Sequence, residues 1–375
     1  MVGSWLLQCY HNYALLVGVT SYRRVAGSFS QTWLTRSYAL AMNVLTLTLL
    51  PGLLWFSTQY IKTINWFPNL ITFTTYILYT MSYVSIAYTL ISRGSRDKAL
   101  LEVERIVNRL KGQQKVHNVL DTEGSCGSLA YLFQLKLGSL LYLCLSGMIS
   151  CLMMPNINNW TPVICAFFFG NTMNIPLLAI YRYFLALWDI AYCYQYLNSE
   201  LEHFMSSVRH RYPTNAELEE LQRLRSLHSL LTRCTLRINK IYGLLLLTIR
   251  FDILAFCVVY GYWGILFSFS VHSPMYLRVF GVVNYNMRLL DFYLLNFMSD
   301  QTVGFQSAAH HVLSEGYWFK ELDAYVLYVC TSKLTLWVCG LYKVNRSCWF
   351  QMIGSIFGFS ILLLQFHLLS NKYTL

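Results

Sequence analysis

The sequence predicts an all-α integral membrane protein with seven transmembrane helices, a cytoplasmic N-terminus and helical cytoplasmic extensions that form an anchor layer. Of its 375 residues, 56% are hydrophobic and only 12% are charged, whereas a soluble domain carries about a quarter charged residues. Several charge-free apolar runs approach or exceed the roughly 20 residues that cross a bilayer. Basic residues gather in alternate segments between these runs, which gives the chain an orientation.

Charge-free stretches locate the spans, because a charge at the bilayer centre costs about 3 kcal/mol on insertion scales. The run over residues 137–181 is too long for one helix, and a turn-rich segment with two prolines at 155–162 interrupts it. The sixth span is the least apolar, since Arg278, Arg288 and Asp291 lie in it. We therefore expect a single polytopic membrane domain over residues 1–375, with spans at about 38–60, 69–92, 129–154, 162–188, 242–269, 274–298 and 347–369.

The distribution of Lys and Arg sets the expected orientation. With the N-terminus inside, the N-terminal tail and the loops 93–128, 189–241 and 299–346 are cytoplasmic, and together they hold 21 of the 28 basic residues. The outer segments hold only Lys62 and Lys372. Because positive charge favours the cytoplasmic face, the C-terminus is expected outside. The net charge of +11 then needs no nucleic-acid partner to explain it.

The cytoplasmic loops carry helix signals of their own. Thr214 followed by Glu217 is a capping box, and it opens a pattern with leucines on one side that continues past Lys240 into the fifth span. Residues 97–111 show a second amphipathic pattern. Residues 5–20 are apolar but short and interrupted by polar side chains, so an interfacial or re-entrant piece is expected there.

The residues give little support for catalysis or metal binding. Eleven cysteines occur without a C-x-x-C or zinc-like spacing, so reduced, buried thiols are expected. His310 and His311 lack the spaced His or acidic partners that a metal-dependent or acyl-transfer site needs. We expect no catalytic residue, no metal and no cofactor.

Four charged residues fall at membrane depth in the fifth and sixth spans. Arg250 and Asp252 lie in the first half of the fifth, and Arg288 and Asp291 lie in the sixth. Charges at this depth pair with one another or serve function. We expect these four to pair between the two spans near the cytoplasmic boundary, in a structural role.

The C-terminal segment reads Trp337-Val-Cys-Gly-Leu-Tyr-Lys-Val-Asn-Arg346, and a charge-free helix follows that ends in Leu-Leu-Leu-Gln365-Phe366. This segment resembles the insect gustatory receptor family, whose members carry a Gly-Leu-Phe-x-x-Asn-like stretch before a last helix bearing Thr-Tyr, five hydrophobic residues and Gln-Phe. Here Gly358 and Phe359 stand in place of Thr-Tyr, and Ser360 interrupts the hydrophobic five.

The resemblance implies a tetrameric, ligand-gated, non-selective cation channel in the plasma membrane of taste neurons, its pore lined by the last helix of each subunit. Gln365 and Phe366 thereby become pore and gate candidates. Helical spacing puts Gly358, Leu362, Gln365 and Leu369 on one stripe, and such an apolar gate blocks ions by dewetting. The other interpretation of Gln365 is a hydrogen bond to a neighbouring helix.

In the family, helices two to six enclose a ligand pocket that opens outward. Aromatic side chains in the outer half of the fifth span and at the start of the fourth are able to stack on flat organic ligands, although aromatics at this depth more often pack helices or form interfacial belts. The candidate ligand-binding residues are Phe168, Asn171, Tyr260 and Trp263. The outer halves are comparatively apolar, which favours a bitter-type, apolar tastant over a sugar.

The expected partners are a small-molecule tastant, membrane lipid and other gustatory receptor subunits in a homo- or hetero-tetramer. An insect odorant receptor shares this topology and assembly, but the Gln-Phe ending favours taste. A multi-pass transporter would show internal repeats and interrupted helices at matching positions, which we do not find in the sequence. A metabotropic seven-helix receptor has the opposite orientation to that indicated by the loop charges.

Overall fold

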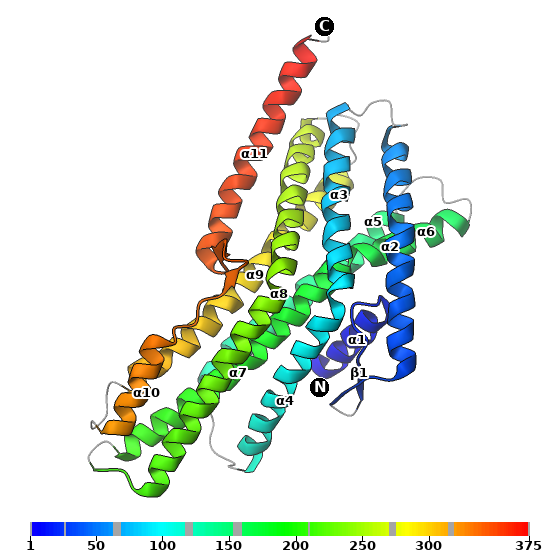
Figure 1. Ribbon diagram of the computed structural model, residues 1–375. Helices are drawn as coiled ribbons and strands as arrows, with labels where there is room; N and C mark the ends of the chain where they lie inside the picture. The colour runs from blue at the N-terminus through cyan, green and yellow to red at the C-terminus, as the bar shows by residue number, and fades with distance from the viewer. Residues whose placement is uncertain are drawn as a thin grey trace.

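The computed structural model describes residues 2–25, 28–62, 69–116, 123–152, 160–208, 211–269, 275–313 and 319–373. Over these ranges the chain forms eleven α-helices and two short antiparallel hairpins (Figure 1). In chain order the elements are α1 (Val2–Leu16), β1 (Arg23–Val25), β2 (Ser28–Ser30), α2 (Trp33–Lys62), α3 (Asn69–Ile91), α4 (Arg93–Val116), α5 (Glu123–Leu152), α6 (Trp160–Met173), α7 (Ile175–Val208), α8 (Asn215–Phe269), α9 (Met275–Leu313), α10 (Lys320–Thr331), β3 (Trp337–Val338), β4 (Tyr342–Lys343) and α11 (Arg346–Tyr373).

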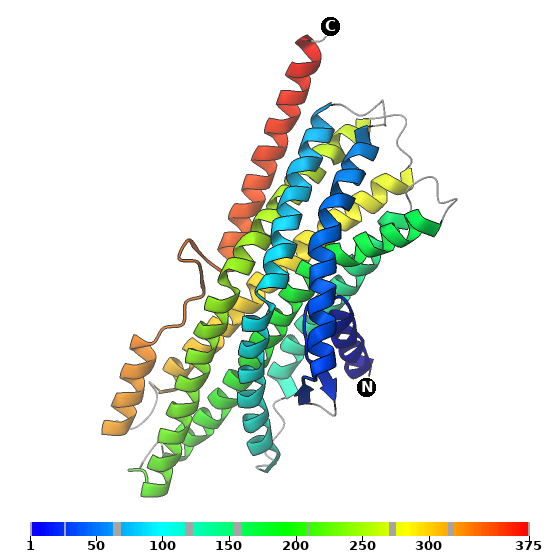
Figure 2. The same cartoon turned by 45° about the vertical axis from the view of Figure 1, so that its right-hand side comes forward.

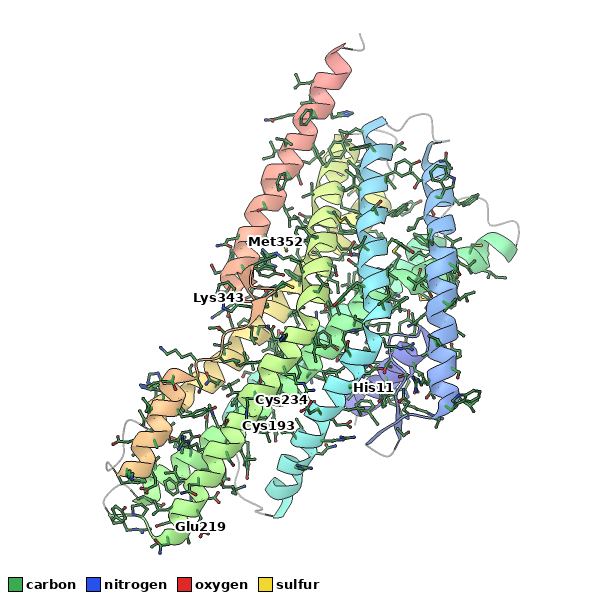
Figure 3. The ribbon with its side chains drawn as sticks, in the orientation of Figure 1. His11, Cys193, Glu219, Cys234, Lys343 and Met352 are labelled. Carbon is green, nitrogen blue, oxygen red and sulfur yellow. The ribbon has the colours of Figure 1, made fainter. Side chains whose placement is uncertain are left out.

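The helices form an elongated bundle. Helices α2, α3, α8 and α11 rise to one end, and α4, α10 and the neighbouring ends of α7 and α8 make the other (Figures 1 and 2). Glu219 lies at the lower end in Figure 3, whereas Lys343 and Met352 lie near the base of α11. The chain is therefore long enough to hold a membrane-depth section and a helical extension beyond it.

Five helical stretches in the described part of the chain are long and apolar enough to cross a membrane. They are Trp33–Gln59, Gly127–Ile149, Val163–Val208 (across α6 and α7), Asn215–Leu266 and Arg346–Leu369. The other two predicted spans fall on α3, which is rich in Tyr and Thr, and on α9, which carries charges. Both helices pack inside the bundle, α3 against α8 and α9 against α7. This packing is compatible with seven membrane crossings. The number of crossings stays a prediction.

Helix α8 extends well beyond the predicted fifth span. Its 55 residues reach about 80 Å at 1.5 Å per residue, whereas a bilayer's hydrocarbon core is about 30 Å thick. The predicted capping box begins it: Thr214 N donates to Glu217 Oε2 at 2.8 Å, and Glu217 N donates to Thr214 Oγ1 at 3.5 Å. Hydrogen bonds from Arg211 and from Thr214 lower the pKa of Glu217 to about 2. The predicted start of this helix is confirmed.

The predicted fourth span is two helices instead of one. Helix α6 ends at Met173 and α7 begins at Ile175, with a turn at Asn174 between them. Pro176 explains the break, because it has no backbone N–H to continue the helical ladder and disfavours helical geometry in the residue before it. Most of the proline-rich segment that precedes α6, residues 153–159, lies outside the described residues.

The N-terminal segment, expected to be interfacial or re-entrant, forms helix α1 with one face buried against the bundle. Tyr10 OH donates to the backbone oxygen of Leu178 at 2.9 Å, and Tyr13 OH donates to Asn171 Oδ1 at 2.8 Å. Asn174 Nδ2 donates back to Tyr13 OH at 2.9 Å. Helix α1 thus supplies hydrogen-bond partners at the break between α6 and α7, as lipid could not.

The segment that follows α1 is held against α4 and α7 by the buried carboxylate of Asp97, which belongs to α4. Asp97 pairs with Arg182 at 2.6 Å, and both side chains are almost fully buried. The same carboxylate accepts hydrogen bonds from Thr20 Oγ1 at 3.2 Å and from Ser21 N at 3.1 Å. A buried ion pair is tolerated when further hydrogen bonds satisfy its lone pairs, and the N-terminal segment supplies them here.

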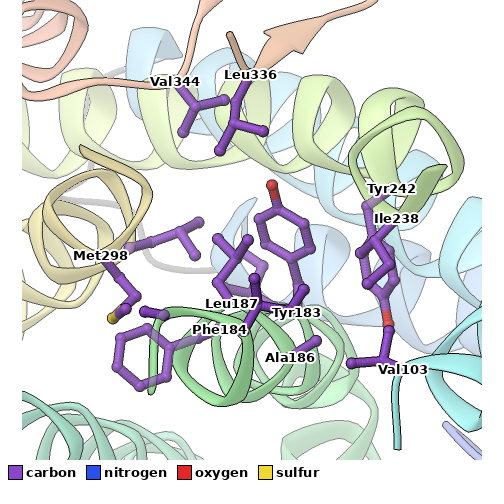
Figure 4. Close-up of a cluster of buried hydrophobic side chains, with 14 of the residues drawn as sticks. Val103, Tyr183, Phe184, Ala186, Leu187, Ile238, Tyr242, Met298, Leu336 and Val344 are labelled. Atoms are coloured by element: carbon purple, nitrogen blue, oxygen red, sulfur yellow. The ribbon is translucent and has the colours of Figure 1, made fainter. Parts of the chain in front are cut away.

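The main core lies where α7 is surrounded by the other long helices. Tyr183, Phe184 and Leu187 of α7 pack between Met298 of α9 and Ile238 of α8, and the residues flanking the β3–β4 hairpin close the cluster (Figure 4). Free, buried cysteines lie along the same helices, with Cys193 on α7 and Cys234 on α8 (Figure 3). Helix α7 is therefore the central helix of the bundle.

The predicted anchor layer has its own core around His228 of α8. The ring lies edge-on to Tyr194 of α7 and to Tyr325 and Tyr328 of α10. Its Nε2 lies 3.3 Å from the backbone oxygen of Gln306 on α9. Burial among these rings lowers the pKa of His228 to about 4. The imidazole is therefore neutral at physiological pH.

Acid is expected to loosen this anchor through His228. An unfolded histidine has a pKa near 6.5, so the unfolded chain takes up a proton before the folded chain does. The stabilisation is present above pH 6.5 and is lost as pH falls toward 4. Between pH 6.5 and 4.5 the wild-type protein should lose about 2 kcal/mol more stability than the His228→Gln variant. Thermal melting of the detergent-solubilised protein at several pH values measures this difference.

Glutamine keeps an N–H donor for the Gln306 carbonyl, so the variant tests titration more than packing. The exposed His203, replaced by glutamine, is the matched control and should leave the pH slope of the wild type unchanged. Parallel slopes for wild type and His228→Gln would contradict the prediction.

Candidate functional site: the final helix and the aromatic face of α8

The residues before α11 form a tight hairpin and a helix cap. Strands β3 and β4 pair antiparallel, and Gly340 in their turn has a φ of +72°, a conformation that glycine adopts without steric cost. Asn345 Oδ1 accepts a hydrogen bond from Cys348 N at 2.8 Å, which makes Asn345 the N-cap of α11. The ion pair between Arg346 and Asp300, at 2.9 Å, holds this start against α9. The residues of the C-terminal motif thus set where the last helix begins.

Only one face of α11 is covered by the rest of the chain. Met352, Ile356, Ser360 and His367 are buried along this face, and α11 packs on α8 and α9. In the most apolar stretch of α11, 22% of the residues are buried, whereas 56% are buried in the most apolar stretch of α8. The remaining apolar surface of α11 needs lipid or another protein to cover it.

The predicted pore stripe lies on the uncovered side. Gly358, Leu362, Gln365 and Leu369 are all exposed, with Leu362 at 47% and Leu369 at 53%. At 100° per residue these four cluster opposite the buried stripe. Phe366 is also exposed, but it points toward the flank of this stripe. Within the described residues, no hydrogen bond joins Gln365 to another helix, so intrachain packing does not account for it.

The aromatic candidates on α8 form a column that faces α3. Phe256 and Tyr260 stack with ring centroids 3.9 Å apart, and Tyr260 lies 5.1 Å from Trp263. Trp263 Nε1 donates to Thr74 Oγ1 on α3 at 3.4 Å. The guanidinium of Arg288 on α9 lies 3.9 Å from the Phe256 ring centroid and closes the column by a cation–π contact.

The structure does not bring the α6 candidates into this column. The amide of Asn171 is engaged by Tyr13 of α1 and by the backbone oxygen of Phe167, at 2.8 and 2.7 Å. Phe168 is half-buried, and its neighbour Phe169 is the residue that meets α3, edge-on to Tyr79 with centroids 6.1 Å apart. The candidate ligand-binding residues therefore divide between two regions.

Helix α3 is among the helices that the family resemblance places around the pocket, but none of its residues is among the sequence-predicted ligand candidates. Thr74 and Tyr79 reach the α8 column and α6, respectively, and Tyr76 lies 6.3 Å from Trp55 of α2. The density of Tyr and Thr in the second apolar run is the signal that could have pointed to them. Such side chains combine an apolar body with a hydrogen-bonding tip.

The predicted pairing of membrane-depth charges between α8 and α9 is wrong. Asp291 pairs with Lys136 of α5 at 2.7 Å, and both side chains are almost completely buried. Ser139 Oγ donates to the same carboxylate at 2.7 Å. Helix α9 packs against α5 and α7 as well as α8, so its charged side chains have more than one neighbour to pair with.

The other three charges also find partners elsewhere. Asp252 accepts a hydrogen bond from Ser82 of α3 at 2.6 Å. Arg250 lies 3.9 Å from the ring centroid of Tyr342 in β4, and Arg288 stacks on Phe256 as described above. Among the described residues, no ion pair joins Asp252 to either arginine. All four charges make contacts within the chain, but the partners differ from those expected, and their structural role stays a prediction.

Comparison with known proteins identifies the class of this molecule. A family model described as the 7tm chemosensory receptor matches residues 7–370, nearly the whole chain. The chain belongs to the 7tm chemosensory receptor family. The resemblance drawn from the C-terminal motif is thereby confirmed, as is the all-α membrane fold. This family is one of receptors, so the chain is not an enzyme.

One curated relative of the receptor is named "Putative gustatory receptor 59b", from Drosophila erecta. The two are 36% identical over 284 residues, which cover 76% of this chain and 48% of the relative. The receptor thus spans about half the length of the curated relative that it matches.

Solved structures show that the fold is shared with insect olfactory receptors. The receptor superposes on olfactory receptor OR5 of Machilis hrabei with a TM-score of 0.67, at 12% identity, over 97% of this chain and 98% of the other. The complex of that olfactory receptor with eugenol gives a TM-score of 0.64 at 13% identity, over 96% and 98%. At these identities the likeness is one of fold.

Proposed function

We propose that this receptor is a gustatory receptor that acts as a ligand-gated, non-selective cation channel in the plasma membrane of sensory neurons. The single observation that carries the proposal is the uncovered stripe on α11, opposite the face packed on α8 and α9. The stripe of Gly358, Leu362, Gln365 and Leu369 is apolar apart from one glutamine, which suits the wall of a pore shared between copies. The gustatory name of its relative supports taste as the modality.

In this proposal four subunits, identical or mixed, place their α11 helices around a central axis. Leu362 and Leu369 then form apolar rings that block ions by dewetting when the pore is narrow. Gln365 presents its amide to water between these rings. With the C-terminus outside, the α11 helix ends each contribute about half a negative charge at the outer mouth, which favours cations without discriminating among them.

The proposed orientation rests on charge. The N-terminus is cytoplasmic, and the lower ends of α4, α7, α8 and α10 form the anchor inside the cell. The segments 93–128, 189–241 and 299–346, to which these ends belong, hold most of the basic residues of the chain. Cytoplasmic loops favour such an excess of Lys and Arg.

The proposed ligand is a small, apolar molecule of bitter type, bound against the aromatic column of α8. Tyr260 and Trp263 offer ring faces, and Phe168 on α6 is a further candidate. The side-chain oxygen of Asn171 already accepts a hydrogen bond from Tyr13 of α1, so Asn171 adds little to the recognition of polar groups on the ligand. A receptor of the same fold has been solved with eugenol, itself a small molecule. A sugar would need several converging polar groups, whereas Tyr260 and Trp263 offer mainly ring faces.

Trp263→Ala is expected to raise the half-maximal tastant concentration about tenfold, because the indole supplies stacking area and holds Thr74 of α3. The loss corresponds to about 1.4 kcal/mol, within the range of one aromatic contact and one hydrogen bond. Dose–response currents in oocytes measure it, with surface expression as the internal check. The control is Trp33→Ala, because Trp33 is 77% exposed at the start of α2. Unchanged potency in Trp263→Ala would remove this residue from the ligand site.

The proposed function is tested by voltage clamp of oocytes that express the receptor, alone and together with other gustatory receptor subunits. A panel of apolar bitter compounds is applied without added G protein. Ligand-evoked cation current supports the channel. Ligand uptake without current would favour a transporter and overturn the proposal.

A further inference from the structure

Helices α8 and α11 meet closely at one point in their upper halves. A Cβ at Gly261 of α8 would lie 2.9 Å from Ser360 Oγ and 3.6 Å from Ser360 Cβ, so a methyl group there fits only if Ser360 Oγ or α11 moves. Ser360 Oγ donates to the backbone oxygen of Val258 at 3.2 Å, across the same contact. The two helices therefore touch here through a glycine and a serine, and the hydroxyl of Tyr285 of α9 lies 4.0 Å from the same Cβ position.

This contact lies on the opposite side of α8 from the aromatic column. Tyr260 and Trp263 face α3, whereas Gly261 and Tyr262 face α11. Tyr262 is fully buried, and its ring lies 6.0 Å from that of His367. One turn of α8 thus touches the candidate ligand face on one side and the last helix on the other.

Ser360 is the residue that interrupts the hydrophobic run before Gln365-Phe366. A hydroxyl at membrane depth needs a hydrogen-bond partner, and Val258 O supplies it. Ser360 lies on the buried stripe of α11, and the proposed pore stripe lies on the opposite side. Ser360 is therefore suited to fix the position of α11 against α8 without facing the proposed pore.

We propose that Gly261 and Ser360 form the positioning contact through which ligand binding at the aromatic face of α8 moves the pore helix α11. The proposal rests on the proposed function and adds the route of its gating. A helix turn is stiff, so a displacement of Tyr260 and Trp263 displaces Gly261 with it. Close packing at this contact passes that displacement to α11, five residues before Gln365.

The test is a two-residue cycle in the full-length receptor. Gly261→Ala places a methyl group against Ser360 Oγ, which must rotate and lose Val258 O, or push α11 away. Ser360→Ala in the same chain removes the oxygen and leaves two methyl groups about 3.6 Å apart, an ordinary contact. Gly264→Ala is the matched control, since a Cβ there meets nothing within 4 Å among the described residues.

Gly261→Ala should raise the half-maximal tastant concentration about fivefold at unchanged surface expression, and the Gly261→Ala/Ser360→Ala double variant should return to within about twofold of wild type. Gly264→Ala should match the wild type. A contact that only packs the fold would lower surface expression and leave the potency of the remaining receptors unchanged.

Two different failures are distinguishable. If wild-type receptor responds but Gly261→Ala shows wild-type potency, or if Ser360→Ala does not reverse its shift, the positioning contact is overturned and the channel stands. If the receptor passes no current with any subunit combination, the proposed function fails and the positioning contact fails with it.

Discussion

Replacing Lys136 by methionine is expected to remove most of the receptor from the cell surface. Lys136 and Asp291 join α5 to α9 at 2.7 Å, with both side chains nearly inaccessible. Methionine keeps the side-chain volume but leaves the Asp291 carboxylate buried with the Ser139 hydroxyl as its donor. Breaking one side of a buried ion pair costs about 3–5 kcal/mol, a large share of the stability of a typical domain. Surface biotinylation and the melting temperature of the solubilised protein measure the loss.

The physical cause is tested by removing the second charge as well. The Lys136→Met/Asp291→Leu double variant has no unpaired charge and should recover most of the lost stability. Arg223→Ala breaks a pair of similar length, 2.5 Å to Glu220, that is partly exposed; such pairs contribute about 0.5 kcal/mol. A single Lys136→Met variant as stable as Arg223→Ala would contradict the importance of burial.

Replacing Leu362 by serine is expected to give a cation current without ligand, at least about tenfold above the wild-type baseline. Leu362 lies on the free stripe of α11, where the proposed closed gate excludes water by its apolar surface. A hydroxyl on each subunit hydrates such a constriction, and hydration removes the barrier to ions. The baseline current of uninjected and wild-type oocytes under voltage clamp provides the comparison.

Leu368→Ser is the matched control for this variant. Leu368 is 61% exposed on the same helix and has the same side chain, but it lies about 100° around the helix from the centre of the stripe. It should keep a wild-type baseline. Equal leak currents in both variants would show that general loosening of α11, and not hydration of a gate, produces the current.

Much of the architecture was readable from local pattern. Charge-free runs predicted the positions of the helices, because lipid excludes charge wherever it lies along the chain. The Thr214–Glu217 capping box was likewise visible, since a cap involves residues only three apart, and the charge-free run placed the start of the last helix within about one residue. The stripe of Gly358, Leu362, Gln365 and Leu369 followed from helical periodicity, and it does lie on one uncovered face.

The partners of the membrane-depth charges were not readable in the same way. Lys136 and Asp291 are 155 residues apart, and their meeting depends on how α5 and α9 rotate about their axes when they pack. Periodicity places residues on a common face of one helix but does not say which neighbour that face meets. The nearest charges in sequence, on α8 and α9, were therefore the wrong partners for each other.

The candidate ligand residues show the same difference between what one helix determines and what the packing of several helices determines. Tyr260 and Trp263 are three apart on one helix, and the structure keeps them together. Asn171 belongs to another helix, and the tyrosine of α1 that engages it comes from a segment 158 residues earlier. The α3 side chains that complete the column were missed because their run carries no charge or motif to single them out.

By itself, the sequence determined the membrane class, most of the helical positions and the family, because each depends on composition or on residues close together in the chain. Tertiary structure alone decided the buried pairs Lys136–Asp291 and Arg182–Asp97 and the contact of Ser360 with Gly261. These features require two or more helices to take definite rotations and depths against each other. That choice belongs to the packing of the whole bundle, since many side chains must satisfy their volumes and hydrogen bonds at once.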